Sequence, residues 1–144
     1  MDANLEEKML KYKKYWDELT DESVEGLREL ASPNVRYRDP FMDAKGIDAV
    51  VAYHHKWFAN LDDNKFEIKE YAVNGLVVYS YWRQTFRLKK LPKKSWELYG
   101  MSKTIYNEAG KIEDHIDYYD SSPILEYLPV LGKVVTLIRK IYTG

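Results

Sequence analysis

The spacing of apolar and polar residues divides the chain into a helical first part, a β-rich middle and an amphipathic tail. Apolar side chains recur at helical spacing over residues 4–18, and the pattern predicts that a second helix begins at Thr20. The Ser-Pro-Asn sequence at 32–34 is expected to end that helix and to lead into a short strand at 35–41. Residues 42–46 read as a loop.

The strongest helical pattern covers residues 47–61, where one wide face is apolar or aromatic. The period then changes to two, and Asn74-Gly75 gives the clearest hairpin signal in the chain. Long strands are expected at residues 66–73, 76–88, 96–106 and 111–119. Helices followed by an antiparallel meander indicate an α+β fold with the helices on one face of the sheet.

The tail at residues 122–142 has an apolar stripe opposed by Lys133, Arg139 and Lys140. Pro129 and Gly132 are expected to split or kink this helix. No linker or internal repeat interrupts the chain, so residues 1–144 are interpreted as one domain with a helical extension at its end.

Composition limits the possible functions. The chain has 144 residues, of which 45% are hydrophobic and 31% charged, as expected for a globular domain. A net charge of −1 gives no electrostatic case for nucleic acid, and the absence of cysteine excludes disulfides and thiolate metal sites. The first twenty residues are charged throughout, and no run of about 18 apolar residues occurs. We therefore expect a cytoplasmic protein.

Asp39 ends the short strand at 35–41 and stands directly before Pro40, which restricts it to extended geometry. With Phe41 following, this is a plausible way to hold a carboxylate at the mouth of an apolar pocket. The simpler interpretation is that Asp39 caps a turn or pairs with Arg36 or Arg38.

The last strand carries a polar row on one face, because side chains alternate along a strand. This row is formed by Glu113, His115, Asp117 and Tyr119. The isoleucines of the other face favour a row in solvent, whereas a cavity above the sheet would turn the row inward. Adjacent His54 and His55 do not share a helix face, so they form a poor metal site. Glu113, His115 and Asp117 could be metal ligands on alternate strand positions, but no further ligand cluster supports this. We therefore expect no metal and no cofactor.

The order of elements, together with several short motifs, resembles the nuclear-transport-factor-2-like superfamily over nearly the whole chain. Within it, the chain is most similar to SnoaL-like and ketosteroid-isomerase-like proteins. The motifs are Tyr15, residues 35–41 with Gly46, Trp96, and the run from 110–112 to 117–120. The resemblance implies a cone-shaped fold in which a strongly curved, mostly antiparallel sheet wraps around a long helix. An N-terminal helical pair and an extra C-terminal helix complete it, and the polar row of the last strand points into the cone.

Two catalytic arrangements follow from the resemblance, and the chain matches each in part. Steroid isomerases use an aspartate at the position of Asp39 as base and a tyrosine at the position of Tyr15 as donor, but their third group falls on Ser102. Polyketide cyclases and limonene-epoxide-hydrolase-like enzymes use an aspartate at the position of Asp117. The Arg-x-Asp pair of the hydrolases has no counterpart, since Arg83-Gln84-Thr85 lacks the acid.

The expected function is therefore binding of a small apolar ligand, with isomerase- or cyclase-type proton transfer on a carbonyl compound in an aromatic pocket. Asp39 is the expected base, Tyr15 a donor, and Asp117 a second acid or base steered by His115. Burial is expected to raise the pKa of both carboxyl groups. The ligand-binding residues are expected to be Phe41, Tyr53, Trp57, Trp82, Phe86, Ser102, His115 and Tyr119.

Two alternatives stay open, a non-catalytic binding module and a dimerisation module, because the same fold serves many functions. A homodimer is expected through the open sheet face, which carries Tyr79 and Tyr99 opposite the pocket. The extension at 122–142 is predicted to pack on the domain or to cap the cone. Contact of this helix with a membrane surface is the less favoured alternative.

Overall fold

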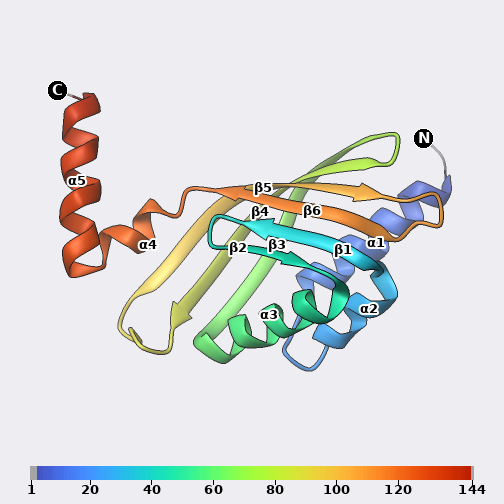
Figure 1. Ribbon diagram of the computed structural model, residues 1–144, viewed down its shortest axis with the longest axis horizontal. Helices are drawn as coiled ribbons and strands as arrows, with labels where there is room; N and C mark the ends of the chain where they lie inside the picture. Colours follow the sequence, from blue (N-terminus) through green and yellow to red (C-terminus); the bar gives the residue numbers. More distant parts are fainter. Residues whose placement is uncertain (1–2, 144) are drawn as a thin grey trace.

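The computed structural model describes residues 3–143 and has a curved sheet with helices beneath it and a helical tail to one side (Figure 1). In chain order the elements are α1 (Ala3–Asp17), the 3₁₀ turn η1 (Val24–Gly26), α2 (Leu27–Leu30), β1 (Ala31–Asp39), β2 (Met42–Lys45), α3 (Ile47–Asn60), β3 (Leu61–Asn74), β4 (Val77–Leu88), β5 (Ser95–Tyr106), β6 (Ile112–Tyr119), α4 (Ser122–Glu126) and α5 (Pro129–Thr143). The predicted α+β class is confirmed.

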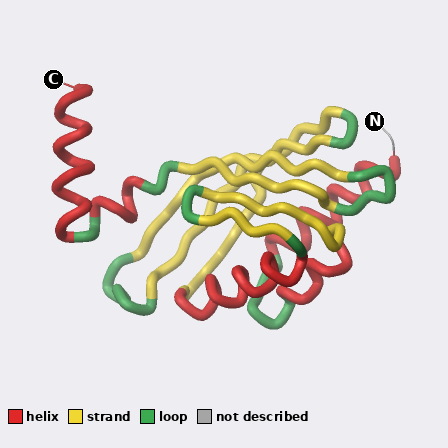
Figure 2. Tube along the Cα trace, in the orientation of Figure 1, coloured by secondary structure: helices red, strands yellow, loops and turns green. Residues whose placement is uncertain are grey.

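The six strands form one sheet in the order β2-β1-β6-β5-β4-β3 (Figure 2). All neighbours are antiparallel except β1 and β6, which are parallel and place Tyr37 opposite His115. On the other side of β6, Asp117 lies opposite Ser102 of β5. This register brings side chains from the beginning, middle and end of the chain onto one face of the sheet.

The core lies between the concave face of the sheet and the helices α1 and α3, as the cone architecture requires. From α1 it contains Met9, Tyr12 and Trp16, and from α3 it contains Val50 and Val51, all buried. The mixed apolar and aromatic stripe of each helix therefore covers the sheet, while their charged residues face solvent. The space that the rings leave open becomes the pocket described below.

Several predicted boundaries moved, each for a local reason. The second predicted helix is reduced to η1 and the single turn α2. Ser23 Oγ bonds the backbone of Thr20, accepting from N–H at 2.9 Å and donating to C=O at 3.2 Å, and such bonds compete with a continuous helix. Residues 42–46 are not all loop, because β2 pairs with β1 through a tight turn that sets Asp39 opposite Met42.

A bulge in β6 changes the alternation predicted for the last strand. Ile105 pairs with Asp114, but the next residue of β5, Tyr106, pairs with Ile112. The extra residue, Glu113, turns into solvent, so Ile112 and His115 are both buried although three positions apart. The prediction that Glu113 shares a face with His115 is therefore wrong.

The helical tail breaks between α4 and α5 and not within one helix, because Pro129 occupies the first position of α5. The short helix α4 packs on the domain, where the ring of Tyr127 meets Trp96 at 5.5 Å between centroids. The longer helix α5 projects away from the sheet (Figure 1). The prediction that the extension packs on the domain or caps the cone is therefore wrong for α5.

Candidate functional site

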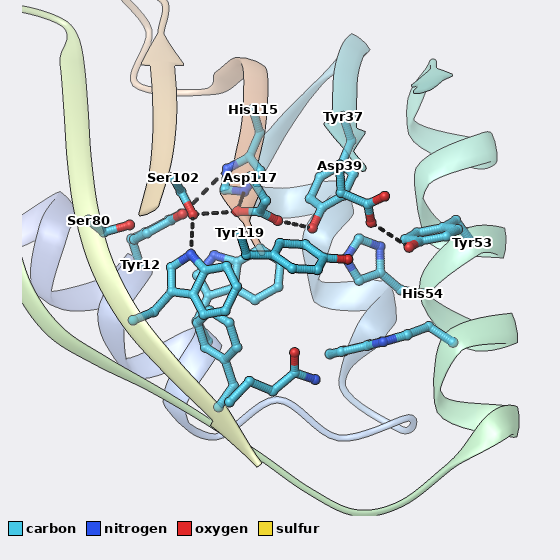
Figure 3. Close-up of a pocket in the computed structure, with 15 residues that line it drawn as sticks. Tyr12, Tyr37, Asp39, Tyr53, His54, Ser80, Ser102, His115, Asp117 and Tyr119 are labelled. Atoms are coloured by element: carbon cyan, nitrogen blue, oxygen red, sulfur yellow. Dashed lines mark hydrogen bonds and ion pairs between the residues drawn. The ribbon is translucent and has the colours of Figure 1, made fainter. Parts of the chain in front are cut away.

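An enclosed pocket lies between the concave face of the sheet, α1 and α3, and we call it the inner chamber (Figure 3). Its cavity volume is about 50 Å³. Eight of its 15 lining residues are aromatic, and none is lysine or arginine. The lining is Tyr12, Trp16, Tyr37, Asp39, Tyr53, His54, Trp57, Phe66, Ser80, Trp82, Gln84, Ser102, His115, Asp117 and Tyr119.

Asp117 is an almost completely buried carboxylate with three hydrogen-bond donors around it. Tyr37 donates to Oδ2, Ser102 donates to Oδ1, and Nε2 of His115 lies 3.0 Å from Oδ1. Burial acts to raise the pKa of Asp117, but the charge of His115 and the three hydrogen bonds outweigh it, so the pKa lies below its ordinary value. The predicted direction is wrong for this residue, because the fold supplies donors for both oxygens.

The hydrogen bonds continue from His115 into α1. Nδ1 of His115 lies 2.9 Å from Oγ1 of Thr104, which lies 3.2 Å from the hydroxyl of Tyr12. The direction of these two hydrogen bonds is set by whether Nδ1 of His115 carries a proton. The buried polar row of β5 and β6 thus forms one connected network that ends on Asp117.

Ser102 is committed to this network and is not free for a ligand. Its hydroxyl accepts from Nε1 of Trp82 at 2.8 Å and donates to Asp117. The indole of Trp82 reaches this position because it lies across Gly100, where a Cβ would overlap the ring. Trp82 and Ser102 therefore hold one another and Asp117 in place.

Asp39 lies at the end of β1 and lines the chamber from the side of α3 (Figure 3). The backbone N–H of Phe41 donates to Oδ1 at 2.7 Å, and the hydroxyl of Tyr53 donates to Oδ2 at 2.5 Å. Asp39 thus caps its turn and also faces the pocket. The sequence had suggested these two roles as alternatives. Arg36 and Arg38 do not pair with it, since they bind Asp43 and Asp114.

Tyr53 remains a donor to Asp39 at neutral pH. Burial and the neighbouring carboxylate of Asp39 raise the pKa of the Tyr53 phenol well above its ordinary value. Each carboxylate oxygen of Asp39 accepts one hydrogen bond and retains a further lone pair. Asp39 is therefore held in a fixed position with one free lone pair on each oxygen, whereas Asp117 has a free lone pair on Oδ2 alone.

Tyr15, predicted as a donor in the cavity, lies outside it. Its hydroxyl donates to the carbonyl oxygens of Ser23 and Val24, both at 3.3 Å. The helix face that meets the chamber is set by Tyr12 and Trp16, which are four residues apart, and Tyr15 lies beside that face. The α1 tyrosine that lines the chamber is therefore Tyr12, whose hydroxyl binds Thr104.

The other predicted ligand-binding residues divide between two cavities. Tyr53, Trp57, Trp82, Ser102, His115 and Tyr119 line the inner chamber. Phe41 and Phe86 line a second, more open cavity of about 440 Å³, which we call the vestibule. Tyr53, Trp57, Gln84 and Tyr119 line both cavities, so they form the wall between them.

Two chamber residues with free polar groups were not predicted as site residues. His54 is buried, with Nδ1 2.8 Å from the carbonyl oxygen of Val50, and burial lowers its pKa to about 4. The ring is therefore neutral at pH 7 and offers Nε2 as an acceptor. The indole N–H of Trp16 is buried without a partner among the described residues. A helix position three or four residues from another lining residue is the signal that could have found both.

In the part of the chain that the structure describes, His, Asp and Glu side chains do not form a group of three that could hold a metal ion. The chamber instead offers fixed carboxylates, aromatic walls and free polar groups. Such a set can bind a small ligand and exchange protons with it.

Comparison with known proteins places the chain in a family. The model described as a SnoaL-like domain matches residues 12–115. The comparison with curated proteins gives no match.

Solved structures share the fold at low sequence identity. A candidate SnoaL-like polyketide cyclase from Jannaschia sp. CCS1 is 15% identical, with a TM-score of 0.71 over 83% of this chain and 87% of that chain. A protein with a ketosteroid isomerase-like fold from Catenulispora acidiphila, in complex with trimethylamine, is 16% identical, with a TM-score of 0.70 over 83% and 89%. An NTF2-like protein of unknown function from Burkholderia pseudomallei is 13% identical, with a TM-score of 0.72 over 82% and 94%. The chain therefore belongs to the SnoaL-like domain family and has the cone fold of NTF2-like proteins.

Proposed function

We propose that the protein binds a small carbonyl compound and that Asp39 moves a proton on it, as in an isomerase or a cyclase. The observation that carries this proposal is the carboxylate of Asp39, which is fixed by Phe41 and Tyr53 at the edge of an aromatic chamber and retains free lone pairs. A positioned carboxylate of this kind is a suitable general base. Membership of the SnoaL-like domain family supports the same reaction class, because solved structures with this fold include a candidate SnoaL-like polyketide cyclase and a candidate isomerase of the SnoaL-like family.

Asp117 has a different role in this proposal. Its oxygens already accept three hydrogen bonds, which stabilise the ionised form and leave a single free lone pair, on Oδ2. Its lowered pKa also makes it a weaker base than an ordinary carboxylate. Asp117 therefore positions Tyr37, Ser102 and His115 and supplies negative charge behind the chamber.

The chamber also contains groups that can stabilise the charge that develops on the substrate. When Asp39 removes a proton from the carbon next to a carbonyl, the electron pair moves onto the carbonyl oxygen and forms an enolate. The indole N–H of Trp16 is buried without a partner among the described residues, and none of their side chains hydrogen-bonds the hydroxyl of Tyr119. Both residues line the chamber. They are the donors for the enolate oxygen, and Asp39 then returns the proton to the same or another carbon.

The sizes of the two cavities define the shape of the ligand. The inner chamber, at about 50 Å³, accommodates only a compact polar head, whereas pockets for drug-sized ligands are roughly 300–1,000 Å³. The vestibule, at about 440 Å³, has apolar walls that include Phe86, Leu98 and Ile124. A ligand with a carbonyl head and an apolar body matches both spaces.

The test is base-catalysed exchange of hydrogen for deuterium next to the carbonyl of 2-alkylcyclopentanones, followed by NMR in heavy water. Asp39→Asn should reduce enzyme-dependent exchange to background. Asp43→Asn is the matched control, because Asp43 is exposed in the same hairpin and pairs with Arg36. Exchange that persists in Asp39→Asn, or that wild-type protein never accelerates, refutes the proposal.

A second candidate function is non-catalytic binding of a small organic cation. Two carboxylates, eight aromatic residues and no lysine or arginine line the chamber, and aromatic faces attract ammonium groups. The structure from Catenulispora acidiphila was obtained in complex with trimethylamine. Calorimetry with choline and its uncharged isostere 3,3-dimethylbutan-1-ol tests this candidate. The candidate is supported if the wild-type protein binds choline but not the isostere, and if Asp39→Asn no longer binds choline. Equal binding of the two compounds excludes it.

A further inference from the structure

Helix α5 presents an apolar stripe that nothing in the described part of the chain covers. Val130, Val134, Leu137 and Ile141 follow one another at three- and four-residue spacing, so they lie along one face of the helix. Val130 is 75% exposed, Leu137 60% and Ile141 71%. Side chains of this size are rarely left uncovered together on the surface of a protein. We call this set the α5 stripe.

The opposite side of α5 is fixed to α4. Gly132 is buried against α4, and a Cβ there would overlap the carbonyl oxygen of Glu126. Arg139 forms an ion pair with Glu126 and donates to the hydroxyl of Ser122 at 2.5 Å. These contacts hold α5 by its polar side, and they turn the α5 stripe away from α4. The α5 stripe is therefore exposed because these contacts with α4 fix the orientation of α5.

The charges beside the α5 stripe have one sign. Lys133 and Lys140 are exposed on the helix, and α5 contains no aspartate or glutamate. Arg139, the remaining basic residue of α5, pairs with acids of α4 and the preceding loop. The free charge of the helix is thus positive although the whole chain has a net charge of −1. A surface that complements α5 has to be apolar and negatively charged.

We infer that α5 binds the surface of an anionic lipid membrane, with the α5 stripe among the acyl chains and Lys133 and Lys140 at the lipid phosphates. Basic amphipathic helices lie in the membrane interface in this way, and long lysine side chains reach outward to the head groups. Tyr142, near the end of the helix, is 86% exposed and has an amphipathic ring that suits the interface. No helix among the described residues is long and apolar enough to cross a membrane.

A second copy of the chain is the competing partner for the α5 stripe. Two copies of α5 packed stripe to stripe would bring Lys133 and Lys140 of each near those of the other. The helix has no acidic residue to balance them, so the pair would be opposed by like-charge repulsion. Lipid phosphates remove that repulsion, and this favours the membrane as the partner.

Co-sedimentation of the full chain with vesicles tests the inference. The protein should bind vesicles that contain phosphatidylglycerol, bind weakly to pure phosphatidylcholine, and lose binding as salt is raised. The double variant Lys133→Glu, Lys140→Glu should bind the anionic vesicles roughly tenfold more weakly or worse. The matched control makes the same charge change in the basic turn after β4, as Lys93→Glu, Lys94→Glu, and should bind as wild type does.

The apolar contribution is tested with Val130→Ser, Leu137→Ser, which should abolish binding while the circular dichroism of the sheet domain stays unchanged. Light-scattering measurement of the mass of wild-type protein and of the same variants tests whether a second copy of the chain covers the α5 stripe. Equal binding to neutral and anionic vesicles, or no binding to either, overturns the inference. A wild-type dimer that becomes a monomer in the serine variant overturns it as well, because a second copy then covers the stripe.

Discussion

The phenol ring of Tyr37 stacks on the imidazole of His115, with centroids 4.8 Å apart and planes 9° from parallel, and both side chains bind the same carboxylate, that of Asp117. The stacking is possible because β1 and β6 are parallel neighbours with these two residues in register. Ser102 completes the group from β5. Side chains of β1, β5 and β6 thus all bind the carboxylate of Asp117, which lines the chamber.

The first prediction concerns this charge. Asp117→Asn should lower the free energy of unfolding by about 2–4 kcal/mol, because one of the three donors then faces an amide N–H instead of an oxygen. Urea unfolding measures the loss. Glu113→Gln on the same strand is the control, since Glu113 is exposed at the bulge, and it should change stability by less than about 0.5 kcal/mol. A tolerated Asp117→Asn would show that the network contributes little to folding.

The second prediction is a dependence of stability on pH that arises from His54. Its pKa is about 4 in the folded protein and roughly 6.5 in the unfolded chain, so the unfolded state takes up the proton first as pH falls. The stabilising contribution is complete above about pH 6.5. It is lost toward pH 4 at about 1.4 kcal/mol per pH unit, a total of roughly 3 kcal/mol.

The slope should become shallower in His54→Asn, which keeps a hydrogen-bond donor near the carbonyl of Val50. The part that remains comes from carboxylates such as Asp117, whose pKa is lowered in the folded protein. Urea unfolding between about pH 7 and pH 4.5 measures it. His55→Asn is the control of opposite sign, because hydrogen bonds to Asp21 and Glu25 raise the pKa of His55. Its stabilising effect is present at low pH and lost as pH rises, so its removal should leave the acid-side loss in place. An unchanged slope in His54→Asn would contradict the burial argument.

The third prediction separates Tyr15 from Tyr119 as donors in the proposed reaction. Tyr119→Phe removes a free hydroxyl from the chamber and should slow ketone exchange by about a hundredfold. Tyr15→Phe removes a hydroxyl that bonds only backbone carbonyls outside the chamber, and exchange should proceed at the wild-type rate. NMR measurement of the exchange rate in both variants is sufficient. Slow exchange in Tyr15→Phe would support the role of substrate donor that the family resemblance implies for Tyr15.

The sequence contained enough information for the fold and for the position of Asp39. The helix at 47–61, the Asn74-Gly75 hairpin and the long strands are governed by local periodicity and turn chemistry, and the structure confirms that they exist. Their bounds are confirmed within a few residues except for β3, which begins at Leu61 although the strand was predicted at 66–73. Asp39 depends only on the geometry that Pro40 enforces, so its placement at a strand end also follows from local rules.

What the sequence did not reveal depends on register between distant strands. Tyr37 becomes part of the site because β1 lies beside β6, and Ser102 becomes a donor because it faces Asp117 across β5 and β6. The bulge at Glu113 has no local sequence signal, although it decides which side chains of β6 are buried. The lowered pKa of Asp117 follows from its contacts with Tyr37, Ser102 and His115. Periodicity and burial alone therefore predicted the direction of this shift wrongly.

The last prediction is the homodimer expected through the open sheet face. On the side of the sheet away from the chamber, the rings of Tyr81 and Tyr99 stack with centroids 6.0 Å apart, next to Met101 and Tyr118, which are 51% and 58% exposed. Covering such side chains would contribute several kcal/mol to association, and lysine at their centre would remove that gain. Tyr99→Lys, Met101→Lys should therefore convert a dimer into a monomer in light-scattering measurements. Leu137→Lys on α5 should leave the dimer intact, and the reverse pattern would place the contact on the helix instead of the sheet.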